Sequence, residues 1–127
     1  MDSKKILIVD DELDILRLTS LRLKKLGYDV ITATDGKEAI NAMHREQPDL
    51  VLLDMILPVM CGANVCRKIK CDKQLKHISV ILFTASSNIM TAEKAKKLRA
   101  DDYIIKPFDP GELTKKIEKI LVQEVIQ

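Results

Sequence analysis

Short apolar runs and amphipathic segments alternate along the chain. Residues 6–9, 50–53 and 80–83 are continuously apolar, which is typical of strands buried on both faces. Residues 30–33 and 103–105 are rich in β-branched and aromatic side chains and predict two further strands. The pattern therefore predicts five short strands.

A helical pattern follows each of these runs. The predicted helices begin near residues 13, 35, 62, 92 and 109. Gly27 and Pro48 end the first two helices, and Asp35 and Asp109 are the expected N-caps of the second and the last. Parallel strands need crossover connections, so this alternation predicts an α/β fold: a doubly wound (βα)5 three-layer sandwich with a parallel sheet.

Composition narrows the class of protein. The length of 127 residues suits one domain over residues 1–127, and 46% hydrophobic with 31% charged residues is typical of a globular chain. A net charge of +2 argues against direct nucleic-acid binding. With no apolar run near the ~20 residues that span a bilayer and no signal peptide, we expect a cytoplasmic protein without membrane contact. The three cysteines are expected to be free thiols.

Chemically active residues follow the predicted strands. Asp10 and Asp11 end the first strand, Asp54 the third, Thr84 the fourth and Lys106 the fifth. The carboxyl ends of parallel strands share one edge of the sheet, where ligands of open α/β folds bind. The sequence thus predicts a pocket with three carboxylates, one hydroxyl and one ammonium group.

This set of residues favours magnesium and phosphoryl chemistry. Three neighbouring carboxylates repel one another unless a cation lies among them, and Mg²⁺ prefers such hard oxygen ligands. Lys106 and Thr84 could hold the oxygens of a phosphoryl group during in-line transfer. A carboxylate such as Asp54 can be the nucleophile and form an acyl phosphate.

Four motifs together resemble the receiver domain of bacterial response regulators in two-component signal transduction. They are Asp10-Asp11, the segment Leu-Leu-Asp-Met-Ile-Leu-Pro-x-x-x-Gly at 52–62, Thr-Ala at 84–85, and Asp-Asp-Tyr-Ile-x-Lys-Pro-Phe at 101–108. The resemblance covers about residues 5–121. It implies a flavodoxin-like sheet in the order 2-1-3-4-5, like the chemotaxis regulators.

The resemblance also implies a role for each acidic residue. Asp54 matches the residue that is phosphorylated. Asp11 and Asp54 match the metal-binding carboxylates, the carbonyl group of Met55 matches a further ligand, and Asp10 assists, often through water. The implied cofactor is Mg²⁺, with Mn²⁺ as a possible substitute.

The remaining motif residues match the rest of the switch. Lys106 matches the lysine that contacts the phosphoryl group, and its bond to Pro107 is typically cis in the family. Thr84 matches the hydroxyl residue that moves toward the phosphoryl group, and Tyr103 the aromatic residue that swings inward. Ala85 is the small residue that leaves access to the acceptor.

Some positions are variable in the family or depart from its pattern. Ile56 and Ser86 flank the site, where such residues tune the lifetime of the phosphoryl group; the apolar Ile56 favours slow self-dephosphorylation. Leu57 and Cys61 replace a common Met and a common acidic residue. Arg99 stands where many relatives have Gly, so it either adopts a left-handed conformation at a cost of about 1 kcal/mol or the loop differs.

The resemblance implies a phosphorylation-activated signalling switch. Its phosphoryl donor would be a sensor histidine kinase or a phosphotransfer protein, and its last two helices and last strand would control a downstream protein or an output domain. It would be a monomer or a phosphorylation-dependent homodimer, and no enzyme beyond self-phosphorylation and autodephosphorylation. Alternatives on this fold are a flavodoxin-like electron carrier, an aspartyl phosphatase and a phosphorylation-independent binding module.

Overall fold

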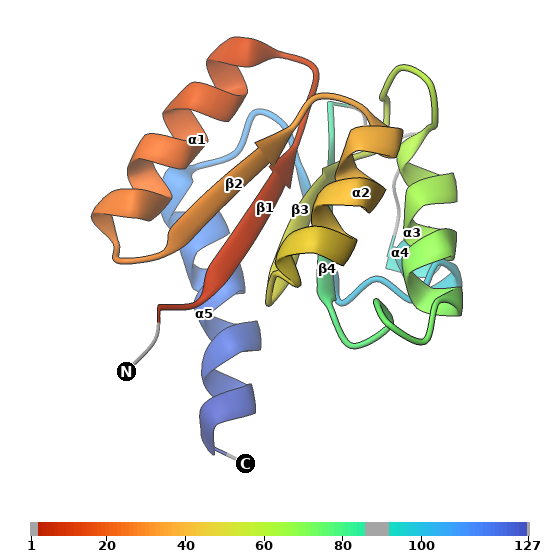
Figure 1. Ribbon diagram of the computed structural model, residues 1–127. Helices are drawn as coiled ribbons and strands as arrows, with labels where there is room; N and C mark the ends of the chain where they lie inside the picture. Colours follow the sequence, from red (N-terminus) through yellow and green to blue (C-terminus); the bar gives the residue numbers. More distant parts are fainter. Residues whose placement is uncertain (1–2, 86–91, 127) are drawn as a thin grey trace.

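The computed structural model describes residues 3–85 and 92–126, in which five strands alternate with five helices (Figure 1). The strands are β1 (Lys5–Val9), β2 (Asp29–Ala33), β3 (Leu50–Asp54), β4 (Ser79–Thr84) and β5 (Asp102–Ile105). The helices are α1 (Leu13–Lys25), α2 (Gly36–Glu46), α3 (Gly62–Cys71), α4 (Ala92–Lys97) and α5 (Pro110–Ile126). The predicted alternation is confirmed.

The strands form one parallel sheet in the order β2-β1-β3-β4-β5, which confirms the order implied by the resemblance. The chain runs outward from β1 to β2 on one side and through β3, β4 and β5 on the other. The strand order therefore reverses between β1 and β3, where ligands of doubly wound folds bind. Every residue of β3 and β4 is buried, as the continuous apolar runs predict.

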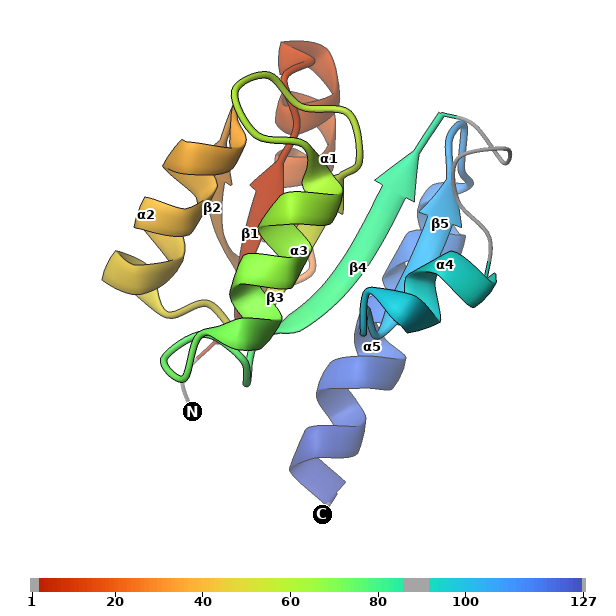
Figure 2. The same ribbon diagram turned by 90° about the vertical axis from the view of Figure 1, so that its right-hand side faces the viewer.

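Helices cover both faces of the sheet (Figures 1 and 2). Helices α1 and α5 pack on one face, where their buried side chains join those of Ile8, Leu52 and Phe83 in one cluster. Helices α2, α3 and α4 pack on the other face, against the alternate side chains of the same strands. This period-two division of the strand residues produces the three layers.

Local signals explain several helix ends. Asp35 caps α2, because its carboxylate accepts a hydrogen bond from the backbone N–H of Glu38 at 2.8 Å. Gly27 follows α1 with a φ of 97°, a conformation that favours glycine. Arg99 follows α4 with a φ of 60°, so the left-handed turn is kept without the glycine common at this position. Val59, in the β3–α3 loop, also has a positive φ, of 70°.

The structure also bears on two expectations from composition. The three thiols are free, with Cys66 buried and the other two cysteines exposed. None of the described helices combines the length and the apolarity that crossing a bilayer requires.

Candidate functional site

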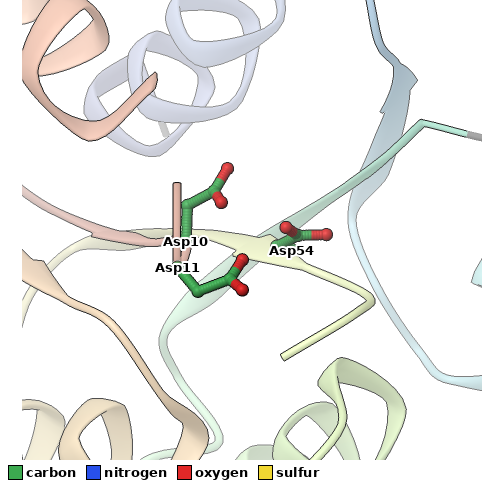
Figure 3. A group of neighbouring side chains, drawn as sticks. All are labelled: Asp10, Asp11 and Asp54. Carbon is green, nitrogen blue, oxygen red and sulfur yellow. The ribbon is translucent and has the colours of Figure 1, made fainter. Parts of the chain in front are cut away.

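Three carboxylates meet where β1 and β3 end (Figure 3). Asp10, Asp11 and Asp54 each offer an oxygen within 4.8 Å of the others. Asp10 is fully buried and Asp54 is 5% exposed, whereas Asp11 is exposed. The sheet edge thus brings together the acidic residues that the sequence predicted to converge.

The ammonium group of Lys106 lies among the carboxylates. Its Nζ is 2.9 Å from an oxygen of Asp10 and 3.4 Å from one of Asp54. It is also 3.8 Å from a carboxylate oxygen of Glu12, a residue outside the sequence motifs. Three carboxylates therefore contact one ammonium group, and with Asp11 beside them the site keeps an excess of negative charge.

Burial and neighbouring charges both shift the pKa values of the site. Burial raises the pKa of Asp54 to about 6, and the charge of Asp10 adds to the effect, while the N–H of Ile56 and the charge of Lys106 oppose it. Burial alone would lower the pKa of Lys106, but its hydrogen bond to Asp10 and the nearby negative charges raise it above its ordinary value. Lys106 is therefore charged at neutral pH. Asp54 is mostly ionised, although burial disfavours its charged form.

The residues present fit a magnesium ion. Each carboxylate oxygen of Asp10 and of Asp54 accepts one hydrogen bond, from the N–H of Glu12 or of Ile56 and from Lys106, and keeps a second lone pair. Asp11 is exposed, and the carbonyl of Met55 accepts one hydrogen bond, from the N–H of Gly62 at 3.0 Å, so it keeps a second lone pair. Asp11, Asp54 and Met55 thus supply hard oxygen atoms with free acceptor capacity, which suits Mg²⁺ or Mn²⁺.

The other predicted residues lie around this group at different depths. Thr84 is buried at the end of β4, and its carbonyl accepts a hydrogen bond from the N–H of Lys106 at 2.7 Å. Ala85 is exposed and lines an open groove next to Lys106. Ile56 is 59% exposed and donates its N–H to Asp54 at 3.1 Å. Ser86 lies outside the described residues.

Tyr103 is not part of the acidic group. Its side chain is half-buried on the face of the sheet that α2, α3 and α4 cover, against the cluster that contains Ala95 of α4. Any effect of the acidic site on Tyr103 must therefore cross the sheet or pass through the strand ends. Farther along the chain, the peptide bond between Lys106 and Pro107 is cis.

Sequence reasoning also missed Phe83. Its ring lies 4.6 Å from the Lys106 Nζ, in a cation–π geometry. The period of two along the fourth strand gives only the face on which Phe83 lies; its pairing with Asp54, which projects to the same face, comes from the strand register.

Comparison with known protein families gives one match over most of the chain. A sequence profile described as the response regulator receiver domain matches residues 6–118. A probable transcriptional regulator, ycf27 of Guillardia theta, is 42% identical over 118 residues, which are 93% of this chain and 45% of that protein. The chain spans about half the length of the curated relatives it matches.

Solved structures show the same fold. The chemotaxis response regulator CheY4 of Vibrio cholerae is 28% identical with a TM-score of 0.86, and the match covers 94% of this chain and 99% of that one. The receiver domain of the sensor histidine kinase PA1611 from Pseudomonas aeruginosa PAO1 is 28% identical with a TM-score of 0.82, and the match covers 93% of this chain and 97% of that one. That structure has a magnesium ion coordinated in its active-site cleft.

Proposed function

The chain belongs to the response regulator receiver domain family of two-component systems, and we propose that it is a phosphorylation-activated switch with Asp54 as the phosphoryl acceptor. One observation carries this proposal: the Lys106 ammonium contacts the carboxylate of Asp54 at 3.4 Å, beside two further aspartates. This pairs a nucleophile with a cation that can bind a phosphoryl oxygen. We take residues 1–127 to be a single receiver domain.

The proposed reaction is an in-line phosphoryl transfer. A carboxylate oxygen of Asp54 attacks the phosphorus atom of a phosphohistidine, and the P–N bond breaks as the new O–P bond forms. The histidine nitrogen keeps the electron pair of the broken bond and takes up a proton. Asp54 must be ionised to attack, and its pKa of about 6 leaves it mostly so at neutral pH. Lys106 neutralises charge on the phosphoryl oxygens, and Thr84 would donate its hydroxyl to one of them.

Magnesium is the proposed cofactor, held by Asp11, Asp54 and the carbonyl of Met55, with Asp10 assisting through water. When bound, it would offset the repulsion among the carboxylates and supply positive charge to the phosphoryl oxygens. The exposure of the two neighbours supports this division of roles, because Asp11 is open to a hydrated ion whereas Asp10 is fully buried.

Phosphorylation would act on the rest of the chain through electrostatics. A phosphoryl group adds charge and acceptor oxygens at Asp54, so Thr84 and Lys106 gain new partners. Thr84 would move toward the phosphoryl group, and Tyr103 would turn inward. Because Tyr103 packs in the same cluster as Ala95 of α4, the α4–β5–α5 face would change shape.

The partners follow from this role. The donor would be a sensor histidine kinase or a phosphotransfer protein, which would place the chain in the cytoplasm. The recipient would be a downstream protein or an output domain, either with the receiver as a monomer or in a phosphorylation-dependent homodimer. We propose no direct contact with nucleic acid or membrane and no turnover of an independent substrate. Loss of the phosphoryl group would be slow, because the exposed side chain of Ile56 cannot orient an attacking water molecule.

The test is phosphorylation by a small donor. The protein is incubated with acetyl phosphate and Mg²⁺, and its intact mass is measured beside an Asp54→Asn control and a sample with EDTA. We expect the wild type to gain one phosphoryl group and both controls to gain none. Absence of phosphorylation with acetyl phosphate and with phosphoramidate would refute the proposal and leave a phosphorylation-independent binding module.

A further inference from the structure

The contact between Phe83 and Lys106 is built into the strand pattern. Phe83 is the register partner of Asp54 across β3 and β4, and it belongs to the cluster on the α1–α5 face of the sheet. Its side chain is almost fully buried, and the Lys106 Nζ lies 4.6 Å from the centre of its ring. The ammonium group is therefore bounded by carboxylates and by the face of an aromatic ring.

A second aromatic ring holds the first in place. Phe108 packs edge-on against Phe83, with 6.4 Å between ring centroids and an interplanar angle of 89°. This arrangement is a favourable one for aromatic pairs, because the positive edge of one ring meets the negative face of the other. The orientation of the Phe83 ring below Lys106 is thus fixed by packing.

Lys106 needs such a restraint. A lysine side chain is flexible and ends in a compact charge, and three carboxylates compete for this one at 2.9, 3.4 and 3.8 Å, from Asp10, Asp54 and Glu12. Glu12 is exposed, so a shift of the ammonium toward it would move the charge away from Asp54. An aromatic face attracts a cation and excludes water on its side, and an aliphatic side chain gives no such attraction.

We propose that Phe83 is a positioning residue: the face of its ring holds the Lys106 ammonium beside Asp54 and so sets how well the site receives a phosphoryl group. This inference rests on the proposed function for its effect on phosphoryl transfer. The position of the ammonium can be tested without it.

The first test uses NMR to establish that the Lys106 ammonium lies against the Phe83 ring in solution. The ε-methylene protons of Lys106 should resonate upfield of those of the other lysines, because they adjoin the Nζ atom that lies over the shielding face of the Phe83 ring. In Phe83→Leu this upfield displacement should vanish. In Ile117→Val, which trims the same cluster from α5, it should remain. An unchanged Lys106 signal in Phe83→Leu would overturn the inference, whether or not the protein accepts a phosphoryl group.

The second test measures phosphorylation by acetyl phosphate with Mg²⁺. The second-order rate constant of Phe83→Leu should fall about three- to tenfold, the range expected for a partly desolvated cation–π contact. Phe83→Tyr keeps the ring and should retain a rate within about twofold of the wild type, as should Ile117→Val. A cavity of about 10 Å³ beside the ring, bordered by Thr19, leaves some room for the added hydroxyl.

A double-mutant cycle separates positioning from loss of packing. In a Lys106→Met background, Phe83→Leu should have no further effect on the phosphorylation rate, because it acts through the ammonium. An equal loss in both backgrounds would mean that Phe83 only supports the core, and the inference would fail. If the wild type is not phosphorylated at all, the proposed function fails, and the NMR result alone decides the position of Lys106.

Discussion

Replacing Asp54 by Asn removes one charge from a buried acidic group, and we expect the change to stabilise the metal-free protein near neutral pH. Asn keeps the shape of the side chain, and its oxygen can still accept the N–H of Ile56, which is 3.1 Å from the Asp54 carboxylate. The Asn amide NH2 group then lies where the second carboxylate oxygen accepts from Lys106 at 3.4 Å, so this contact is lost, but Lys106 keeps Asp10 as a closer partner at 2.9 Å.

The magnitude follows from the pKa of Asp54. Burial raises that pKa from 3.8 to about 6, so the folded state binds the proton more tightly than the unfolded state. The contribution of Asp54 to stability therefore falls as the pH rises from about 4 to about 6 and stays lower above that range. The shift of about two units corresponds to about 3 kcal/mol. This net shift already contains the attraction to Lys106. Less the cost of placing the Asn amide group beside the ammonium, we expect Asp54→Asn to gain about 1–2 kcal/mol at pH 7.5.

The assay is urea unfolding of both proteins in EDTA at several pH values between 4 and 8. The difference in free energy of unfolding should be near zero at pH 4 and should grow through pH 6 to a plateau. Asp14→Asn, which neutralises an exposed carboxylate of α1 outside the acidic group, should change the free energy by no more than about 0.5 kcal/mol. Added Mg²⁺ should stabilise the wild type more than Asp54→Asn, since the ion needs the carboxylate.

Two results would refute this reasoning. One is a lower stability of Asp54→Asn at pH 7.5, which would mean that the attraction to Lys106 outweighs the cost of burying the charge. The other is a difference that does not change between pH 4 and pH 7.5, because a gain independent of pH cannot come from the ionisation of Asp54.

Further predictions concern the backbone and the thiols. Arg99 and Val59 have φ values of 60° and 70°, so replacing either by Gly should raise the free energy of unfolding by about 0.5–1 kcal/mol in urea titrations; unchanged midpoints for both would argue against strain. A Cβ at Gly62 would collide with the backbone carbonyl of Asp54, so Gly62→Ala should cost about 2–4 kcal/mol in thermal unfolding, and an unaltered melting temperature would show that the loop yields freely. Thiol titration of the native protein should detect the two exposed cysteines, with Cys66 reacting only on unfolding; rapid reaction of all three would contradict its burial.

The sequence by itself determined the elements and the set of chemical groups. Continuous apolar runs predicted the buried strands, and Asp35 and Gly27 marked helix ends, because these signals depend on neighbouring residues and on backbone geometry. The position of Asp54 and Lys106 at strand ends was enough to predict that they converge, since parallel strands share one carboxyl edge. The order of the strands came from the resemblance to receiver domains.

Only the tertiary structure decided how these groups meet. The contact between Lys106 and Asp10 joins residues 96 positions apart, and its partner choice depends on side-chain rotamers that no local pattern specifies. The raised pKa of Asp54, the ring of Phe83 beneath the ammonium and the left-handed backbone of Arg99 likewise arise from packing. Periodicity gives the face on which a residue lies, whereas distances of a few ångströms depend on how separate elements pack together, and these distances set the electrostatics of the site.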